Sequence, residues 1–447
     1  MNLLKKRENV AFYDKWEQEP QETREKVIRS RLEDYIGLAL STAGSFYQPR
    51  IGKINFSDNQ PLKNVPIMKS QDLRELLPPK NNILNGKRTT DFTVFQSGGT
   101  TGAPKTTLFS NEELDNLTLP NARGFFALGL TENDKVANLF AAGGLYMTFI
   151  HINRMLQEYG CMNFPFSNHT PADFVHAVAR LFEINCFAGI TSVVLDCLRK
   201  FPELGLDGIK IEKVFFGGEH IYEADREELQ KKLGVKLIAA PGYGTVDTWY
   251  IGYQCLHCPP GVFHAHDDQT YIELIDEETG AACPPGKAGT MLATPFPRRI
   301  TPVVRYLVGD RAQWLENKCQ CGRTTPLFKL LGRGDDVLRI GFDSIDYNFI
   351  QDAALHINGL SGTIQMEKRR ISGKDQFIIR VESEAHVDKH VALAKELSEK
   401  ILSLRPSLKS FIEKGTVFPI EIEILPLAAI PRNSRTGKLT RVIDSIE

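Results

Sequence analysis

The sequence predicts an α/β protein with a large N-terminal α/β domain, which carries flanking helices and a β subdomain, followed by a small α+β domain. Three observations support this prediction. Strand-like and helical segments alternate from residue 91 to about residue 250, which favours a parallel sheet covered by helices. From about residue 262 strand-like segments follow one another, as in an antiparallel region. The 447 residues are enough for two or three cores.

The first half of the chain gives the elements of the parallel region in order. Residues 1–45 are expected to be helical because apolar residues recur three and four positions apart. A strand is predicted at 91–96, and a helix follows from Asn111, its expected cap. Further segments are a helix at 171–184 and strands at 135–141, 186–190, 213–219 and 235–244. Polar loops after such strands are where α/β proteins bind ligands.

The second half predicts the β subdomain and the last domain. Strand-like runs at 262–276, 288–295 and 301–314 form the antiparallel region. A strand–helix–strand pattern then covers 371–383, 390–404 and 417–426. We place the boundary near Gly334–Asp336, which gives domains 1–334 and 335–447.

The charge balance excludes some classes of partner. Lys and Arg number 54, and Asp and Glu number 55, so nothing indicates a nucleic-acid or membrane-surface partner. The N-terminus turns polar after four residues, and the most apolar stretch, 136–150, is too short to span a bilayer. We expect a cytoplasmic protein, and a homodimer is left open.

Seven of the eight cysteines fall into two groups. Cys161, Cys186 and Cys197 lie in apolar surroundings and are expected to pack in a core. The sequences "CLHC" and "CQCGR" form two close pairs, which suit one tetrahedral structural Zn²⁺. The four ligands would be Cys255, Cys258, Cys319 and Cys321. Alternatives are unliganded thiols, or a histidine in place of one cysteine, with His257, His264 and His266 as candidates.

The loop "SGGTTGAPK" after the first predicted strand has the composition of an anion site. Backbone N–H groups of a Gly-rich turn can converge on a phosphate, hydroxyls add donors, and Lys105 adds a charge. The spacing differs from the Walker motif. A Ser/Thr-rich surface turn is the alternative interpretation of this loop by itself.

Further motifs follow the loop in a fixed order: "FFGGEH" (215–220), "PGYGTVD" (241–247), "YLVGDRAQW" (306–314), "LLGRGDDV" (330–337) and "IPRNSRTGKLTR" (430–441). Together they resemble the adenylate-forming superfamily of acyl-CoA synthetases, peptide-synthetase adenylation domains and luciferases. The GGE motif, the length and the late cysteine pairs are most similar to the phenylacetate-CoA ligase branch. The resemblance runs from about residue 90 to the C-terminus.

The resemblance implies a role for each motif and a mobile C-terminal domain. Catalytic roles fall to Lys438, which would bridge the substrate carboxylate and the α-phosphate, and to Thr100 and Thr101. Asp335 would be the hinge, and Asp247 would hold Mg²⁺. The other implied ATP-binding residues are Ser97, Gly98, Gly99, Gly102, Lys105, Gly218, Glu219, Tyr243 (stacking on adenine), Gly244, Thr245, Asp310 (accepting from the ribose hydroxyls) and Arg333.

Two departures from the family pattern concern these roles. "YGTVD" places Val246 where a hydroxyl commonly occurs and Asp247 where the family commonly has Glu, with Thr245 as a neighbouring substitute. The segment "RIGFDSIDYNFI" lacks the Asn-x-Phe-Pro pattern that shapes the thiol tunnel in phenylacetate-CoA ligases. The resemblance therefore supports the adenylation step better than it supports CoA as the acceptor.

The resemblance implies an ATP- and Mg²⁺-dependent enzyme that activates a carboxylic acid, aromatic by family, to an acyl-AMP and transfers it to a pantetheine thiol. Candidate walls of the acyl pocket are Phe140, Tyr146, Phe216 and Trp249, although core packing explains each of them equally well. Three alternatives stay open. The acceptor is a carrier protein's phosphopantetheine, a phenol is adenylylated instead of a carboxylate, or the protein is a non-catalytic nucleotide binder.

Overall fold

The computed structural model describes residues 12–86, 88–96, 105–218, 221, 223–334, 337–340, 343–371, 374–415, 417–432 and 439–445. The chain divides into two compact units. Unit 1 comprises Met1–His220 and Leu229–Leu331, and unit 2 comprises Ile221–Glu228 and Gly332–Glu447. The described part of the chain holds no helix that is both long and apolar enough to cross a membrane.

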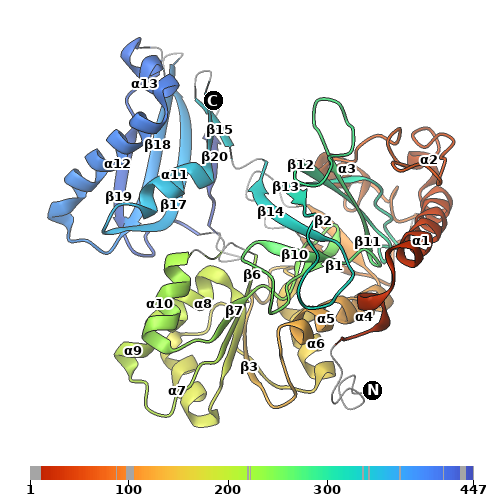
Figure 1. Cartoon of the computed structure of the whole chain (residues 1–447), viewed down its shortest axis with the longest axis horizontal. Helices are drawn as coiled ribbons and strands as arrows, with labels where there is room; N and C mark the ends of the chain where they lie inside the picture. Colours follow the sequence, from red (N-terminus) through yellow and green to blue (C-terminus); the bar gives the residue numbers. More distant parts are fainter. Residues whose placement is uncertain are drawn as a thin grey trace. The chain divides into compact units, whose positions relative to one another are not determined.

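The N-terminal helices of unit 1 pack on a loop and a strand that lie far along the chain (Figure 1). Within the predicted helical region 1–45, the described residues from 12 onward form a 3-10 turn, a long helix and the start of a second helix, and a third helix follows. These elements are η1 (Lys15–Gln18), α1 (Gln21–Thr42), α2 (Gly44–Tyr47) and α3 (Ser70–Leu76).

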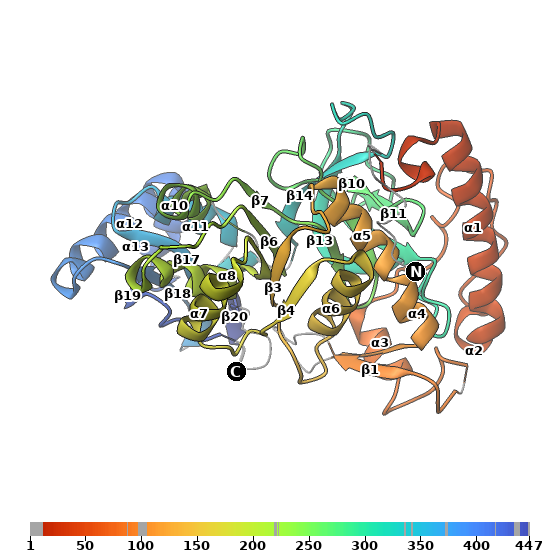
Figure 2. The same ribbon diagram turned by 90° about the horizontal axis from the view of Figure 1, so that it is seen from below.

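A five-stranded parallel sheet in the order β4-β3-β5-β6-β7 forms the predicted α/β region. Helix α8 packs against β5 and β6, and α6 packs against β3, β4 and α5 (Figure 2). The strands are β3 (Lys135–Leu139), β4 (Met162–Pro165), β5 (Cys186–Ile190), β6 (Lys213–Gly217) and β7 (Leu237–Ala239). The helices are α4 (Asn111–Asn116), α5 (Thr118–Ala127), α6 (Thr148–Tyr159), α7 (Ala172–Phe182), α8 (Thr191–Arg199), α9 (Phe201–Leu204) and α10 (Glu223–Leu233).

The predicted helix from Asn111 differs from the structure in two ways. It is divided into α4 and α5, and its cap is Ser110. The Ser110 hydroxyl accepts from the Glu113 amide at 3.1 Å while the Glu113 carboxylate accepts from the Ser110 amide at 2.7 Å. This reciprocal capping box satisfies two backbone donors, which a cap at Asn111 would leave to water.

The β subdomain is a seven-stranded sheet in the order β11-β12-β13-β14-β10-β9-β8. The predicted strand 235–244 is divided between two sheets, because β7 ends in the parallel sheet and β8 begins this one. The strands are β8 (Tyr243–Thr245), β9 (Trp249–Tyr253), β10 (Val262–Ala265), β11 (Thr270–Ile275), β12 (Gly289–Pro295), β13 (Tyr306–Trp314) and β14 (Leu327–Arg333). A separate hairpin pairs β1 (Thr93–Gln96) with β2 (Thr106–Phe109).

Unit 2 has its own core between a four-stranded sheet, in the order β19-β18-β17-β20, and its helices. Helix α11 begins after Asp346, whose side chain accepts from the Asn348 amide at 2.7 Å. The elements are β15 (Val337–Ile340), β16 (Asp343–Asp346), α11 (Tyr347–Leu355), β17 (Leu360–Ile371), β18 (Lys374–Ser383), η2 (Val387–Lys389), α12 (His390–Leu404), α13 (Pro406–Glu413), β19 (Glu421–Pro426) and β20 (Val442–Ser445). The α/β class predicted from the sequence is confirmed. The boundary at residue 334 stays a prediction.

Candidate active site

Two of the residues assigned to adenosine lie in direct contact. The Tyr243 hydroxyl donates to Oδ2 of Asp310 at 2.6 Å, although the two residues lie on β8 and β13, which are not neighbours in the sheet. The Tyr243 ring lies 5.5 Å from the Phe263 ring and 5.8 Å from the Phe328 ring, between centroids. These contacts hold an aromatic ring beside a buried carboxylate, the pair of groups that suits a base and a ribose.

A second cluster joins residues assigned to the phosphates and the metal. The Lys105 ammonium forms an ion pair with Oδ2 of Asp247 and donates to the Tyr306 hydroxyl at 2.7 Å. Tyr306 in turn donates to Oδ2 of Asp247 at 2.9 Å. Asp247 is 1% exposed, so its charge is stabilised mainly by these two side chains. The cation follows directly after the hydroxyl-rich loop in the sequence.

Strand β13 carries one member of each cluster, Tyr306 and Asp310, four residues apart. At about 3.3 Å per residue the two lie at most ~13 Å apart along the strand. The pairing with β12 shifts between them, and Gly309 has φ of 88°, a value that favours glycine. Such a bulge redirects the following side chain, here Asp310. Strand β13 therefore sets the distance between Asp310, which is assigned to the adenosine of ATP, and Tyr306, which contacts the residues assigned to the phosphates.

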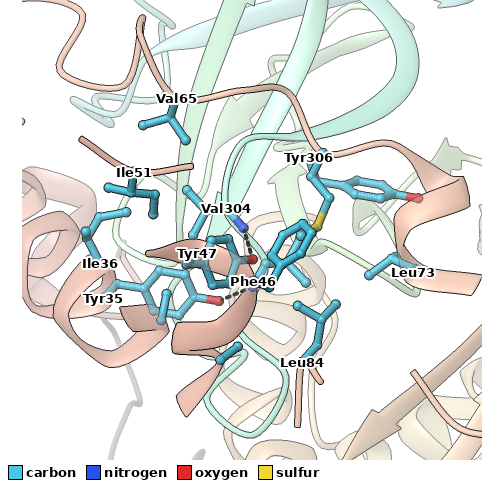
Figure 3. Packing of buried hydrophobic residues seen from close by; sticks show 14 of the residues in the cluster. Tyr35, Ile36, Phe46, Tyr47, Ile51, Val65, Leu73, Leu84, Val304 and Tyr306 are labelled. Carbon is cyan, nitrogen blue, oxygen red and sulfur yellow. Dashed lines mark hydrogen bonds between the residues drawn. The ribbon is translucent and has the colours of Figure 1, made fainter. Parts of the chain in front are cut away.

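The N-terminal helices hold the segment that leads into β13 (Figure 3). The Tyr35 hydroxyl accepts from the Val303 amide at 2.9 Å, and the Tyr47 hydroxyl accepts from the Val304 amide at 3.2 Å. Tyr306 is itself a buried member of this helical core. The first 90 residues therefore position Tyr306, which contacts Lys105 and Asp247.

The turn between β8 and β9 explains the departure at Val246. The Thr245 hydroxyl lies 2.8 Å from the Thr248 hydroxyl and accepts from the amides of Asp247 and Thr248 at 3.3 and 3.2 Å. A Cβ on Gly244 would lie 2.1 Å from the Trp249 carbonyl oxygen, so the turn requires glycine there. Thr245 thus stabilises the turn that presents Asp247, while Val246 packs on the core beside Trp249.

One oxygen of Asp247 has the surroundings expected of the predicted metal ligand. Among the residues that the structure describes, Oδ1 of Asp247 is buried and has no hydrogen-bond partner. A single hard carboxylate oxygen fits Mg²⁺, which keeps several waters and takes one or two protein carboxylates beside substrate phosphates. The donor chemistry at this position therefore fits the metal that the sequence predicts.

The four residues assigned to the acyl pocket differ in their surroundings. Phe140 and Trp249 are 4% and 2% exposed and belong to two different cores. Tyr146 is half-buried against the core of the parallel sheet. Phe216 is 7% exposed at the end of β6, and the Phe140 ring lies 3.4 Å from where a Cβ on Gly217 would stand. Core packing accounts for Trp249, and the pocket role of all four stays a prediction.

The late cysteines meet in one cluster. The Sγ atoms of Cys258 and Cys319 each lie 3.6 Å from Sγ of Cys255. Ligand atoms of Cys255, Cys258, Cys319 and His264 all lie within 4.8 Å of one another. Sγ of Cys321 lies 3.4 Å from Nε2 of His264. Five candidate ligands therefore surround a site that takes four.

The histidine of this cluster is His264, one of the three candidates named from the sequence. Nδ1 of His264 lies 3.1 Å from the Thr325 hydroxyl, and the other ring nitrogen, Nε2, faces the cysteine sulfurs. His266 instead contacts Arg123 at 2.9 Å. The contact with Cys255 and then His264 lower the pKa of the Cys258 thiol to about 6, although burial opposes this. Thiolate chemistry at this cluster fits zinc.

The remaining predicted residues divide into two that the structure describes and nine that lie outside the described residues. Arg333 is the last residue of β14. Gly218 follows β6 with φ of 81°. The predicted site residues outside the described part of the chain are Ser97, Gly98, Gly99, Thr100, Thr101, Gly102, Glu219, Asp335 and Lys438.

Sequence reasoning missed Tyr306 and Thr248, which the structure adds to the phosphate cluster and its turn. Tyr306 begins the "YLVGD" motif from which only Asp310 was chosen. A search for polar residues elsewhere in the same predicted strand could have found it. None of the sequence motifs indicated a role for Thr248.

Comparisons with known proteins were made for the whole chain. No protein-family model matches it. The chain is 25% identical over 404 residues to phenylacetate-coenzyme A ligase of Thermus thermophilus, which covers 87% of this chain and 88% of that protein. It is 24% identical over 400 residues to the ligase of the same name from Escherichia coli, with 87% and 86% covered. The crystal structure of 2-hydroxyisobutyryl-CoA ligase with 2-HIB-AMP matches with a TM-score of 0.78 and 22% identity, and covers 98% of this chain and 93% of that one.

The fold, the ordered motifs and these relatives together define the class. The chain belongs to the adenylate-forming superfamily. Within that superfamily, it is similar over most of its length to phenylacetate-coenzyme A ligases.

Proposed function

We propose that this protein is an ATP- and Mg²⁺-dependent acid–thiol ligase that activates an aromatic carboxylic acid and transfers it to CoA. The observation that carries the proposal is the arrangement on β13, where Tyr306 reaches Lys105 and Asp247 while Asp310 reaches Tyr243. One bound ATP can contact both clusters, with its adenosine at Asp310 and its phosphates near Lys105.

The reaction would run in two steps. A carboxylate oxygen of the acid attacks the α-phosphorus of ATP, the bond to the β-phosphate oxygen breaks, and pyrophosphate leaves. The thiol of CoA, after losing its proton, then attacks the carbonyl carbon of the acyl-AMP, and AMP leaves. Lys105 and Lys438 would offset negative charge in the first step, since cations placed at a developing charge stabilise the transition state. Mg²⁺ held by Asp247 would supply further charge neutralisation on the phosphates.

The named relatives support CoA as the thiol and an arylacetic acid as the starting point for the substrate search. The missing Asn-x-Phe-Pro pattern keeps a carrier-protein acceptor as the second candidate. In this chain the segment forms the β15–β16 hairpin and the start of α11.

A pyrophosphate-release screen tests the proposal. Purified protein, ATP and Mg²⁺ are combined with a panel of aromatic and aliphatic acids, and the products are analysed with CoA, with a phosphopantetheinylated carrier protein and with neither. We expect acid-dependent pyrophosphate and an acyl-CoA product. Pyrophosphate with a loaded carrier but no acyl-CoA would instead identify a carrier-loading enzyme. Absence of acid-dependent pyrophosphate across the panel, with folded protein, would contradict the proposed function.

We further propose that the cysteine cluster holds one structural Zn²⁺. Cys255, Cys258 and Cys319 would be three of the ligands, and the fourth would be His264 or the originally predicted Cys321. Such an ion joins the segment after β9 to the loop between β13 and β14, and a site with four protein ligands has no position left for a substrate. Zinc therefore contributes to folding rather than to the reaction.

Cys258→Ser is expected to lower both the zinc content, from about one per chain, and the melting temperature, because the metal's binding energy is folding energy. Elemental analysis and thermal unfolding measure the two effects. Cys283→Ser is the control, since it removes a buried thiol that lies outside the cluster. Full zinc content and unchanged stability in Cys258→Ser would reject the site. A comparison of Cys321→Ser with His264→Gln identifies the fourth ligand by which variant loses zinc.

A further inference from the structure

A buried histidine behind the predicted nucleotide strand has an unused polar atom. His151 on α6 is 3% exposed, and burial lowers its pKa to about 3, so the ring is neutral at pH 7. Nε2 of His151 contacts the amide nitrogen of Asn121 on α5, which is 1% exposed. Nδ1 has no hydrogen-bond partner among the described residues. A buried polar atom without a partner costs folding free energy, so its presence calls for an explanation.

The position of this pair connects it to the candidate active site. The His151 ring lies 5.6 Å from the Tyr250 ring, between centroids, and Tyr250 pairs with Gly244 across the β8–β9 turn. A Cβ on Gly242 would stand 2.7 Å from the Tyr250 ring and 3.5 Å from Oδ1 of Asn121. Gly242 precedes Tyr243, the residue assigned to adenine. His151 and Asn121 therefore lie beside the β8–β9 segment, which carries residues assigned to ATP binding.

A residue assigned to the predicted acyl pocket lies close to His151 in the chain. Burial raises the pKa of Tyr250, and an electrostatic interaction with Tyr146 adds to this effect. Tyr146 is one of the residues assigned to the acyl pocket, and it lies just before α6, the helix that carries His151. Aromatic rings at this position suit an aromatic acid, whereas the imidazole adds a single polar group to their apolar surface.

The hydrogen-bonding role of the imidazole follows from its neighbour. The Asn121 amide nitrogen is a donor, so Nε2 of the neutral ring accepts and the proton resides on Nδ1. Nδ1–H is then a buried donor that needs an oxygen. An unsubstituted hydrocarbon ring would leave this donor unpaired, whereas a hydroxyl, methoxy or keto oxygen on the ring would pair with it.

We propose that His151, held by Asn121, is a specificity-determining residue that donates a hydrogen bond from Nδ1 to an oxygen substituent on the aromatic acid. The substrate class is therefore ring-oxygenated aromatic acids, such as hydroxylated phenylacetates or benzoates. This inference rests on the proposed ligase function and adds to it the chemistry of the acid.

The test compares acids that differ at one ring position. Values of kcat/KM for pyrophosphate release are measured for phenylacetate and benzoate and for their 2-, 3- and 4-hydroxy and 2-, 3- and 4-methyl derivatives. One hydroxy isomer should exceed its methyl counterpart by about tenfold or more, the effect of one hydrogen bond that the methyl group cannot make. His151→Leu should reduce that ratio to about one, and His151→Gln, which keeps a donor, should retain part of it.

His176→Leu is the matched control. His176 is also a buried histidine on a helix, but its Nε2 contacts the Gly205 carbonyl oxygen at 2.7 Å, and it should leave the ratio unchanged. Equal kcat/KM for hydroxy and methyl acids in the unmodified protein would overturn the inference and leave the ligase function standing. A hydroxyl preference that persists in folded His151→Leu would also overturn it. Failure of every acid would overturn the ligase function and this inference with it.

Discussion

Replacing Lys438 with Ala is expected to lower acyl-AMP formation by about 10²–10³-fold, the contribution of one well-placed charged group to a transition state. Lys438 lies outside the described residues, and its role rests on the "TGK" setting near the C-terminus and on the superfamily resemblance. Release of pyrophosphate from ATP and the acid measures the first step. Formation of acyl-CoA from separately prepared acyl-AMP measures the second step.

The two steps should respond differently to this change. If Lys438 acts only in adenylation, the second step keeps most of its rate in Lys438→Ala. Lys409→Ala on α13 is the control for loss of a lysine from the same unit, and both rates should stay normal in it. Equal losses in the two steps, with normal thermal stability, would contradict a role confined to the first step.

Replacing Asp247 with Asn is expected to reduce adenylation by about 10²-fold or more and to raise the Mg²⁺ concentration that half-saturates the enzyme. Changes even to groups behind a metal ligand cost about 10–100-fold, and Asp247 is proposed as a ligand itself. The change keeps the size of the side chain but removes the charge that faces Lys105 and replaces one of the two carboxylate oxygens by an NH2 group, which cannot bind a cation. Steady-state rates across a Mg²⁺ titration measure both effects.

The chain provides a matched control for this prediction. Asp134 and Lys213 form another buried pair at 2.7 Å, with exposed side-chain fractions of 3% and 18%, against 2% and 16% for Asp247 and Lys105. Asp134→Asn should therefore cost comparable stability, because each change leaves a buried cation without its carboxylate. It should not change the Mg²⁺ dependence. If the two variants lost activity only in proportion to their loss of folded protein, Asp247 would be a structural residue.

Asp247→Glu gives an additional comparison, because the superfamily commonly has Glu at this position. The longer side chain would move the carboxylate by one methylene toward the phosphates. We expect Asp247→Glu to keep more activity than Asp247→Asn, since it preserves the charge and the hard oxygens.

The sequence alone predicted the class of fold and the order of the motifs. The predicted strand 135–141, helix 171–184 and strand 186–190 become β3, α7 and β5, because hydrophobic periodicity within one element is a local property that the sequence displays directly. The residues Tyr243, Asp247 and Asp310 were chosen through the superfamily resemblance of their motifs, which is also visible in the sequence itself. The α/β class and the superfamily are confirmed, and the residue roles stay predictions.

Two predicted elements differ from the structure, the helix cap at Asn111 and the strand at 235–244. The cap at Ser110 rather than Asn111 was decided by the reciprocal bonds with Glu113, and Glu113 also accepts from the Arg299 amide at 2.6 Å, 186 residues away. The division of 235–244 between two sheets depended on the strands that pair with each half. The capping box has a local signature, a Ser followed three residues later by a Glu, whereas the division of 235–244 has no signature within the segment.

Only the tertiary structure decided which residues meet. Lys105, Asp247 and Tyr306 are up to 201 residues apart in the chain, and the helical core of the first 90 residues holds Tyr306 in place. His264 lies in the cysteine cluster, whereas His266 contacts Arg123 instead. His151 and Asn121 lie on separate helices, and no motif marked either of them. Patterns of polarity record which residues are buried, but the pairing of buried polar groups is fixed by backbone topology, because each must find its partner wherever the folded chain brings one within hydrogen-bond distance.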